Sequence, residues 1–396
     1  MRAASHNSIA ALEAGQWNAL SGSEAPFLRH EFLSALERHG CVGGQGANHT
    51  GWTPAYITLS DQQGLAAAAP AFIKGHSYGE FVFDFSWAEA YARHGLHYYP
   101  KLAVCVPFTP ATGPRLLVRP GLDAVAVQAR LIRAIGEYAA DNGLSSAHAL
   151  FLDEPARAAF SAAGWLLRRD CQFRWTNHGY ADFEAYLATF SADKRKKARR
   201  ERRRVAEDGI SFETRFGPEL SPRLLDTVYA FHRATFLRHG NEPYLTRGFF
   251  GEIATTLGES LMVKLAMKAG RPVAAAVFFW HPEALYGRYW GAADEHHSLH
   301  FEACYHQGVE FCIERGIRRF EPGTQGEHKV ARGFSPTLTW SAHSIADARF
   351  RAAIRDHLER EGEAVDAYAA QVGEHVPYRQ NLGQSLPGLA PGPDLS

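Results

Sequence analysis

The stretch LMVKLAMKAGRPVAAAVFFW, residues 261–280, decides the fold, because an apolar run lies on each side of a Lys-Ala-Gly turn. This pattern predicts a β-hairpin. The segment TPAYITLSDQQGLAAAAPAFI, residues 53–73, repeats the pattern around a Ser-Asp-Gln-Gln-Gly turn. An internal duplication is the simplest interpretation. The matched positions, with a leucine five residues before the turn glycine, are Leu59 and Gly64 in one copy and Leu265 and Gly270 in the other.

Each hairpin is followed further along by a helix that ends at a glycine and then by another strand. The first copy has Asp-Asn-Gly-Leu at residues 141–144 before an apolar run at 147–152. The second copy has Glu-Arg-Gly-Ile at residues 314–317 before the run at 318–321, and residues 285–290 add a strand to its hairpin. Glycine at these positions is typical of a helix C-cap. Each copy therefore predicts an α/β or α+β unit with a mixed central sheet flanked by helices.

The length of the chain supports two such units. At 396 residues and 43.8 kDa it exceeds one ordinary compact core. We predict a first domain over residues 1–178, with an insertion at about 74–114, and a second domain over residues 179–379. Residues 380–396 are rich in proline, glycine and serine, which predicts a disordered tail.

Composition excludes several classes of protein. Lysine and arginine together number 42, as do aspartate and glutamate, so the net charge of zero excludes a uniformly basic coat protein for nucleic acid. The five cysteines form no CxxC pair and no HExxH occurs, so we expect no disulfide framework, zinc ribbon or other metal site. No apolar run approaches the roughly 20 residues that span a bilayer, so we expect a soluble, cytoplasmic protein without a transmembrane segment.

A basic segment, SADKRKKARRERRR at residues 191–204, carries nine cations and two acids. Its residue types favour a helix, with Ser191 at the N-cap. Only alanines interrupt the charges, so we expect a largely solvated helix without a packing stripe. Two interpretations stay open, a solvated surface helix and a helix that binds the phosphate groups of a polyanion or donor. The candidate phosphate-binding residues are Lys194, Arg195, Lys196, Arg199 and Arg200.

Polar side chains gather where a strand ends in the second half of the chain. Arg288 lies in the strand at residues 285–290, and His300, Glu302 and Tyr305 open the helix that follows. The place where strands end and helices begin is the usual position of ligand sites in α/β sheets. Glu302 is equally well explained by the favourable interaction of an acid with a helix N-terminus.

The segment EPGTQGEHKVARGF, residues 321–334, is a third candidate region. Gly323 and Gly326 let the backbone approach a ligand closely. A base and cations follow in three successive positions, Glu327, His328 and Lys329. A polar surface loop is the alternative. The candidate substrate-binding residues of this segment are Glu321 and Gln325.

The insertion in the first copy carries further candidates. Strand alternation places Glu80, Val82 and Asp84 on one face, where two carboxylates can serve acid/base chemistry or bind an amine. An exposed strand face is the alternative. The other candidate substrate-binding residues here are His76, Tyr78, Tyr99, Lys101 and Thr109.

Six motifs carry a family resemblance when they are taken together. They are KGHSYGEFVFDFSWAEAYARHGLHYYPKL (74–102), PFTPATGPR (107–115), SADKRKKARRERR (191–203), LYGRYWG (285–291), LHFEACYHQG (299–308) and EPGTQGEHKVARGF (321–334). This set resembles the FemAB-like family of bacterial N-acyltransferases, which are relatives of the Fem peptidoglycan-bridge ligases. The resemblance implies tandem acetyltransferase-like (GNAT) domains. It also implies a donor that is an acyl-CoA, an acyl carrier or an aminoacyl-tRNA, and an amine acceptor on a nucleotide- or lipid-linked peptide.

The resemblance extends to particular positions, with two departures. The basic segment matches the Lys/Arg-rich helix that opens the second domain of the family. Lys329 with Gly333 and Phe334 is similar to the Fem Lys-Gly-Phe loop, although here the lysine is farther from the glycine. Ordinary acetyl-CoA enzymes of the superfamily show Arg/Gln-x-x-Gly-x-Gly/Ala after the strand, whereas residues 292–297 read Ala-Ala-Asp-Glu-His-His. Plain acetyl-CoA is therefore a less expected donor.

We therefore predict an N-acyltransferase in which an amine attacks an activated ester or thioester directly, without a metal or a covalent enzyme intermediate. No cofactor is expected to stay bound, and an acyl-CoA, an acyl carrier protein or an aminoacyl-tRNA serves as co-substrate. The expected partners are a small-molecule or peptide amine and an anionic lipid-linked precursor. Two alternatives stay open. One is an aminoacyl-tRNA-dependent Fem-type ligase in cell-wall metabolism, and the other is a non-catalytic protein that recognises a cell-wall precursor or RNA.

The predicted roles follow from the needs of that reaction, a base, oxyanion donors and an acid for the leaving group. They are Glu327 or His328 as the base, Lys329 or Arg288 at the oxyanion, Tyr305 as the acid, Glu302 as the group that orients it, and Glu80 and Asp84 at the acceptor amine.

Overall fold

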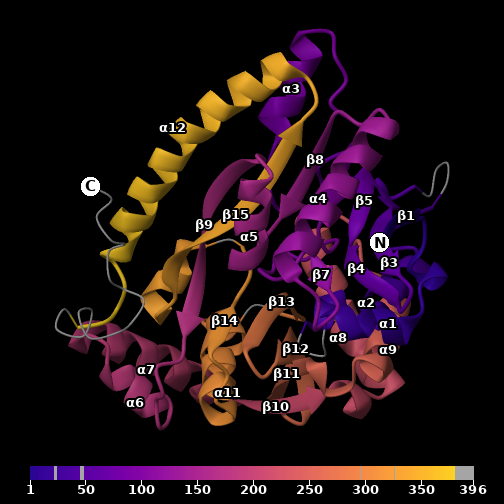
Figure 1. Ribbon diagram of the computed structural model, residues 1–396. Helices are drawn as coiled ribbons and strands as arrows, with labels where there is room; N and C mark the ends of the chain where they lie inside the picture. Colours follow the sequence, from indigo (N-terminus) through magenta and orange to yellow (C-terminus); the bar gives the residue numbers. More distant parts are fainter. Residues whose placement is uncertain (22–24, 45–48, 295, 325, 380–396) are drawn as a thin grey trace. The chain divides into compact units, whose positions relative to one another are not determined.

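The computed structural model describes residues 1–21, 25–44, 49–294, 296–324 and 326–379 (Figure 1). Its internal contacts divide the chain into two compact units. Unit 1 comprises Met1–Cys171, Tyr244–Leu257 and Leu338–Ala367, and unit 2 comprises Gln172–Pro243, Gly258–Thr337 and the chain from Tyr368 onward. The boundary predicted at residues 178 and 179 stays a prediction. The expected tail, residues 380–396, lies outside the described residues.

The two predicted hairpins are present, one in each unit. Strand β3 (Tyr56–Asp61) pairs with β4 (Gly64–Ala69), and β11 (Leu261–Lys268) pairs with β12 (Arg271–His281). Asp61 faces Gly64 as Lys268 faces Arg271, and the register shifts by one residue shortly after each turn. This shared irregularity agrees with a duplication. By register Gly64 corresponds to Arg271, so the predicted match with Gly270 is wrong by one residue.

Unit 1 contains two sheets. One has the order β1 (Arg2–His6), β3, β4 and β7 (Leu117–Val118). The strands of the other are, in order, β15 (Ser335–Ile345), β8 (Ser146–Leu150), β6 (Lys101–Val104), β5 (Ala71–Lys74) and β2 (Trp52–Pro54). The strand predicted over residues 65–73 is divided into β4 and β5 at Pro70, because proline cannot donate a ladder hydrogen bond.

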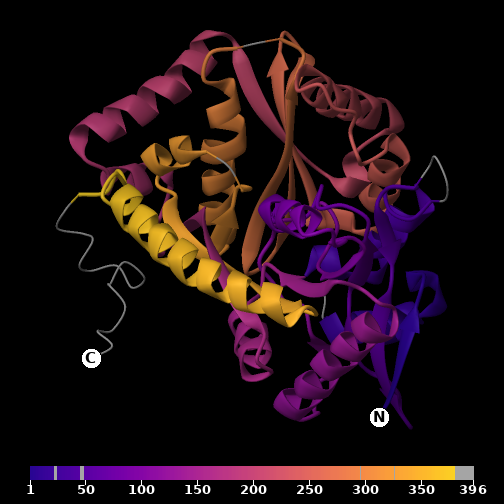
Figure 2. The same ribbon diagram turned by 90° about the horizontal axis from the view of Figure 1, so that it is seen from above.

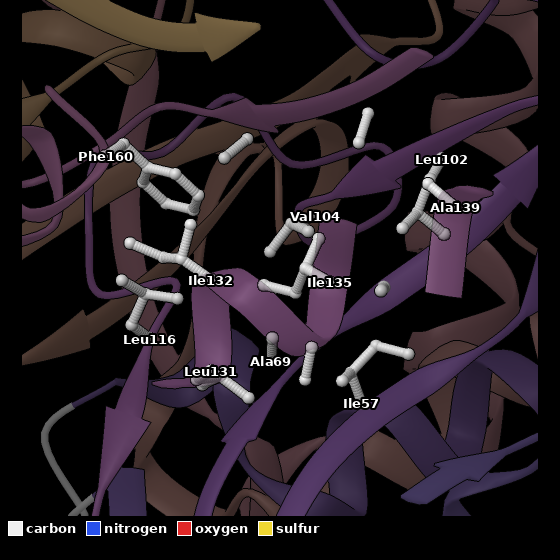
Figure 3. Packing of buried hydrophobic residues seen from close by; sticks show 14 of the residues in the cluster. Ile57, Ala69, Leu102, Val104, Leu116, Leu131, Ile132, Ile135, Ala139 and Phe160 are labelled. Carbon is white, nitrogen blue, oxygen red and sulfur yellow. The ribbon is translucent and has the colours of Figure 1, made fainter. Parts of the chain in front are cut away.

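The core of unit 1 forms where α4 (Ala124–Asp141) packs on these strands. Leu131, Ile132 and Ile135 of α4 belong to one buried cluster with Ile57 and Val104 (Figure 3). Burying each such side chain contributes about 1.5–3 kcal/mol relative to exposing it. The predicted glycine after this helix is Gly143, whose φ of 62° is the left-handed conformation that a helix end requires.

The other helices of unit 1 come from several separate parts of the sequence. They are α1 (Ala14–Ser21), α2 (His30–Arg38), α3 (Phe85–Arg93), α5 (Glu154–Ala162), α9 (Arg247–Thr256) and the first part of α12 (Ala348–Gly373). Figure 2 shows α12, in yellow, as one continuous helix. Within the described residues, no helix is both long and apolar enough to cross a membrane.

The prediction of a strand around residues 80–84 is wrong. Residues 75–84 form turns and bends before α3, and Phe81 has a φ of 60°. A strand needs extended backbone at every residue, so the alternation of Glu80, Val82 and Asp84 does not place them on a strand face.

Unit 2 has one mixed sheet flanked by helices. Its strand order is β10 (Ile210–Phe216), β11, β12, β13 (Ala284–Ala292), β14 (Arg319–Glu321) and the end of β9 (Leu166–Thr176). The pairing is antiparallel except between β13 and β14, which are parallel. The helices are α6 (Phe183–Ala188), α7 (Ala192–Glu207), α8 (Pro222–Arg238), α10 (Leu299–Phe301) and α11 (Gln307–Arg315).

The core of unit 2 joins the sheet to α11. Phe278 of β12 and Phe320 of β14 are buried with Val309 and Cys312 of α11. The predicted helix end after α11 is confirmed, because Gly316 adopts a φ of 66° and strand β14 follows. Both units combine a mixed sheet with flanking helices, which confirms the predicted α/β class.

Candidate active site

A solvent-open pocket of about 390 Å³ lies in unit 2 between β12, β13 and the turns that follow them. Its lining residues are Ala276, Val277, Phe278, Gly287, Arg288, Tyr289, Trp290, His300, Cys304, Tyr305 and Pro322. Arg288, His300 and Tyr305 are predicted to lie together where a strand ends and a helix begins, and the structure brings these three to one pocket.

Arg288 owes its position to a β-bulge. Val277 pairs with Tyr289 while Phe278 pairs with Gly287, so Arg288 is the extra residue of β13. A bulge bends the strand and re-aims the side chains beside it. Gly287 also matters here, because a Cβ at this position would approach the backbone of Pro322 to 3.3 Å. The bulge and the glycine together shape this wall of the pocket.

A π-helical turn, Glu302–His306, lies between α10 and α11 and contributes to the pocket lining. Such turns insert one residue into a helix and are frequent at functional sites. This turn carries Cys304 and Tyr305, both of which line the pocket. Burial raises the pKa of the Cys304 thiol, and nearby Lys329 opposes that rise only in part. Cys304 is therefore a thiol and not a thiolate at neutral pH.

Tyr305, which lines the pocket, and His328, which is exposed and not among the lining residues, form a hydrogen-bonded pair with 2.8 Å between Tyr305 Oη and His328 Nε2. Burial, Lys329 and Arg332 lower the pKa of His328, and burial raises the pKa of Tyr305. Burial and the neighbouring cations also lower the pKa of His300 to about 4. At neutral pH the imidazoles are uncharged and the phenol keeps its proton, so the pair can both accept and donate a proton.

Lys329 is a buried cation beside this pair. Its Nζ donates a hydrogen bond of 2.6 Å to the Gly323 carbonyl, and its exposed fraction is 2%. Burial lowers its pKa from 10.5 to about 7. No ion pair joins it to an acid within the part of the chain that the structure describes. Lys329 therefore lies near the pocket as a poorly solvated amine held by one carbonyl.

The other candidates of residues 321–334 do not face the pocket. Glu327 is exposed, and its Oε1 accepts a hydrogen bond of 2.8 Å from Tyr368 Oη. Glu321 is buried on β14 and pairs with Arg174 and Arg319 at 3.0 and 3.4 Å. Gln325 lies outside the described residues. Of the two predicted bases, the geometry favours His328.

Glu302 does not contact Tyr305, as the predicted orienting role requires. Its Oε1 accepts hydrogen bonds from Arg202 Nε at 3.2 Å and from Gln307 Nε2 at 2.8 Å. The side chain that orients the Tyr305 hydroxyl is His328.

The basic segment forms α7, but the expectation of no packing stripe is wrong. Ala198, Glu201 and Val205 are buried along one side of the helix. Ser191 occupies the N-cap position, although its side chain makes no capping hydrogen bond. Among the candidate phosphate-binding residues, Lys194, Lys196, Arg199 and Arg200 are exposed and Arg195 is half-buried. Arg199 already pairs with Glu184 at 2.5 Å.

The carboxylates of Glu80 and Asp84 meet an amine within unit 1. Lys101 Nζ donates to Ser77 Oγ and Glu80 Oε2 at 2.8 Å each, and also to Asp84 Oδ2. Burial would raise the pKa of Asp84, but Lys101, His148 and hydrogen bonds outweigh burial and lower it to about 2. All three side chains are at most 3% exposed, so one lysine is shared by two carboxylates inside unit 1, and burial raises the pKa of Glu80.

The remaining candidates of unit 1 are dispersed. Tyr99 Oη lies 2.8 Å from Ser77 Oγ beside the buried cluster, and the Thr109 hydroxyl donates to the Pro107 carbonyl. The rings of His76 and Tyr78 pack edge to face, and Tyr78 is 69% exposed. Among the described residues no group of three or more His, Cys, Asp or Glu side chains is arranged to hold a metal ion.

Sequence reasoning did not single out Glu201, Arg202, Cys304 or Arg332. A usable signal existed for Glu201, which is the only acid after Asp193 in the run of cations. An acid at a helix position surrounded by cations is a candidate for an inward-facing ion pair.

Comparison with solved structures supports the fold. The C-terminal domain (DUF2156) of an Agrobacterium fabrum protein described as a lysylphosphatidylglycerol synthetase matches with a TM-score of 0.54 and 11% identity, over 87% of this chain and 96% of that chain. FemX matches with a TM-score of 0.53 and 10% identity, over 90% of this chain and 100% of that chain. A tandem GNAT protein from the clavulanic acid pathway matches with a TM-score of 0.45 and 14% identity, over 87% and 98%.

At these identities the likeness concerns the fold alone, and it confirms the expected α/β class. A comparison with curated proteins gives no match. The family described as FemAB-like, peptidoglycan biosynthesis/recognition, matches residues 8–380. The chain therefore belongs to the FemAB-like family.

Proposed function

We propose that unit 2 carries an N-acyltransferase site, in which an amine attacks the carbonyl carbon of an ester or thioester donor. The observation that carries the proposal is the Tyr305–His328 pair at the pocket beside the Arg288 bulge. Membership of a family of peptidoglycan biosynthesis or recognition proteins supports an acceptor amine from peptidoglycan metabolism.

The proton path uses both partners of the pair. The amine nitrogen forms a bond to the carbonyl carbon, and the bond from that carbon to the leaving sulfur or oxygen breaks. His328 takes the surplus proton of the nitrogen at Nδ1, and its Nε2 proton passes to Tyr305 Oη. Tyr305 gives its own proton to the leaving group. The uncharged state of His328 and the protonated state of Tyr305 at neutral pH suit these roles.

The oxyanion needs hydrogen-bond donors in a part of the pocket that is partly shielded from water. Arg288 is the candidate, because its guanidinium belongs to the pocket lining and always carries charge. Lys329 is committed to the Gly323 carbonyl, so in this proposal it holds the turn next to the pocket and adds positive potential.

The donor carries phosphate in each candidate class, whether acyl-CoA, carrier protein or aminoacyl-tRNA. The exposed cations of α7 suit such a group. Lys194, Lys196 and Arg200 make no ion pair with another described residue, so their charge is available to a polyanion.

The test incubates the purified full chain with acyl-CoAs, acyl carrier protein or aminoacyl-tRNA, together with peptidoglycan-precursor peptides that carry a free amine. Product is followed by mass spectrometry. His328→Gln and Tyr305→Phe are expected to lower turnover about 100-fold or more. Glu327→Gln, a neighbouring acid outside the pocket, is the matched control and is expected to keep turnover. Folded His328→Gln and Tyr305→Phe proteins with full activity would refute the assignment.

A failure to find turnover is separated from a failure to bind. Cys304 lines the pocket, so a bound donor should protect its thiol from N-ethylmaleimide. Protection without product favours the recognition protein over the enzyme.

A further inference from the structure

Helix α7 has a second face that points away from its exposed cations. Two consecutive residues, Glu201 and Arg202, leave the run of exposed side chains and make ion pairs with the segments that bear the pocket. Glu201 is buried, and Arg202 is 27% exposed at its side chain. Arg202 contacts the π-helical turn and α11, whereas Glu201 contacts Arg332 and also lies 3.4 Å from His306 at the end of the π-helical turn.

Glu201 is bonded to the short helical turn Glu327–Arg332, which carries His328. Its Oε1 and Oε2 accept hydrogen bonds from Arg332 Nη2 at 2.7 Å and Arg332 Nε at 3.1 Å. The third nitrogen of the same guanidinium, Nη1, donates to the His328 carbonyl at 2.6 Å. Arg332 also lies 3.5 Å from the centre of the Phe301 ring. The guanidinium therefore ties α7 to the backbone of His328.

Arg202 is bonded to the π-helical turn, which carries Tyr305. Its Nε donates to Glu302, the first residue of the π-helical turn, and its Nη2 donates to Glu310 of α11 at 2.8 Å. The guanidinium packs 4.3 Å from the centre of the Phe183 ring. The π-helical turn is therefore anchored at its start by α7 and not by the sheet alone.

We infer that Glu201 and Arg202 are positioning residues, which set the separation between the π-helical turn and the turn Glu327–Arg332 and so the Tyr305–His328 contact. The catalytic role of that contact rests on the proposed function, whereas its dependence on Glu201 and Arg202 does not. Because both anchors lie on one turn of one helix, loosening either is expected to separate these two segments and to expose the part of the π-helical turn beside Tyr305. The helix would thus combine an outward face of exposed cations with an inward face that holds the site.

Cys304 reports on this separation without any substrate. It is half-buried in the pocket lining next to Tyr305, whereas Cys312 of α11 is fully buried in the core of the same unit. Alkylation of each cysteine by N-ethylmaleimide is followed by peptide mass spectrometry on the full chain. Separation of the two segments accelerates the alkylation of Cys304 alone, whereas loss of the fold accelerates the alkylation of both cysteines.

The decisive variants are Arg202→Gln and Glu201→Gln, each of which we expect to alkylate Cys304 about tenfold faster than the wild type with Cys312 unchanged. Arg199→Gln is the matched control. This substitution removes one cation from the same helix. The partner of Arg199 is Glu184 of α6, which is exposed and belongs to neither the π-helical turn nor the turn Glu327–Arg332. We expect it to react at the wild-type rate.

If Glu201→Gln fails to fold because Arg332 is left as a buried charge, the double variant Glu201→Gln with Arg332→Gln removes both charges and serves in its place. Wild-type rates at Cys304 in the anchor variants would overturn the inference, and so would equal acceleration of Cys304 and Cys312. Neither result depends on whether a donor is ever turned over, so this test and that of the proposed function fail separately.

Discussion

Replacing Lys329 by methionine should change how the stability of the protein depends on pH. The lysine is 2% exposed, and its amine donates a hydrogen bond to the Gly323 carbonyl. Burial lowers its pKa from 10.5 to about 7. Methionine has a similar length and no charge, so Lys329→Met removes the titration while it keeps most of the packing.

The sign of the effect follows from proton counting. Between pH 7 and 10.5 the folded lysine binds fewer protons than the unfolded one, so the free energy of unfolding of the wild type rises with pH in this window. With these pKa values, raising the pH from 7 to 9 adds about 2 kcal/mol to the wild type from this group alone. The variant lacks this contribution. The lost hydrogen bond to Gly323 and any packing change are the same at both pH values, so they cancel in the comparison.

The assay is urea unfolding of wild type and variant at pH 7 and pH 9. The stability of Lys329→Met relative to the wild type should be about 2 kcal/mol less favourable at pH 9 than at pH 7. Lys196→Met, at an exposed lysine of α7, is the matched control and should show the same difference at both pH values. A pH-independent difference for Lys329→Met would refute the argument that this amine titrates in that range.

Two further predictions concern packing and acid stability. Gly291→Ala should destabilise the protein by about 3 kcal/mol in urea unfolding, because its Cβ would lie 2.1 Å from the Phe231 carbonyl oxygen, whereas Gly136→Ala, with nothing within 4 Å, should stabilise α4 by about 0.5–1 kcal/mol. Equal effects of the two would contradict the packing argument. Asp84 has its pKa lowered from 3.8 to about 2, so it contributes stability above pH 3.8 that is lost as the pH falls through 2. The stability that Asp84→Asn loses, about 2 kcal/mol at pH 7, should therefore vanish on acid titration, and a loss that persists at pH 2 would argue against the ion pair with Lys101.

The parts of the fold that were predictable rest on local chemistry. The hairpins follow from apolar runs on each side of a short turn, and the ends of α4 and α11 follow from glycines that adopt a positive φ. Such signals are contained within a few neighbouring residues. The signal that divides the strand at Pro70 is also local, since proline removes a ladder donor. The prediction of one strand over residues 65–73 overlooked it.

Predictions failed where a distant residue decides the conformation. Glu80 and Asp84 alternate as in a strand, yet the segment turns, and Lys101 binds both carboxylates in the interior of unit 1. Two carboxylates cannot be buried without a cation, and the sequence pattern around residue 80 holds no sign of which cation it will be. In the same way, nothing near Glu302 indicates that Arg202 is its partner.

Sequence alone was enough for the family, the α/β class, the helix over the basic run and the grouping of Arg288 with Tyr305 at a strand end. These depend on residue type and on spacing along the chain. Tertiary structure alone decided that Glu201 and Arg202 face inward, that His328 and not Glu327 meets Tyr305, and that Lys329 is buried without an acid among the described residues. The physical reason is the same in each case. The energy of a buried charge depends on partners brought together from distant parts of the sequence, and only the folded chain specifies them.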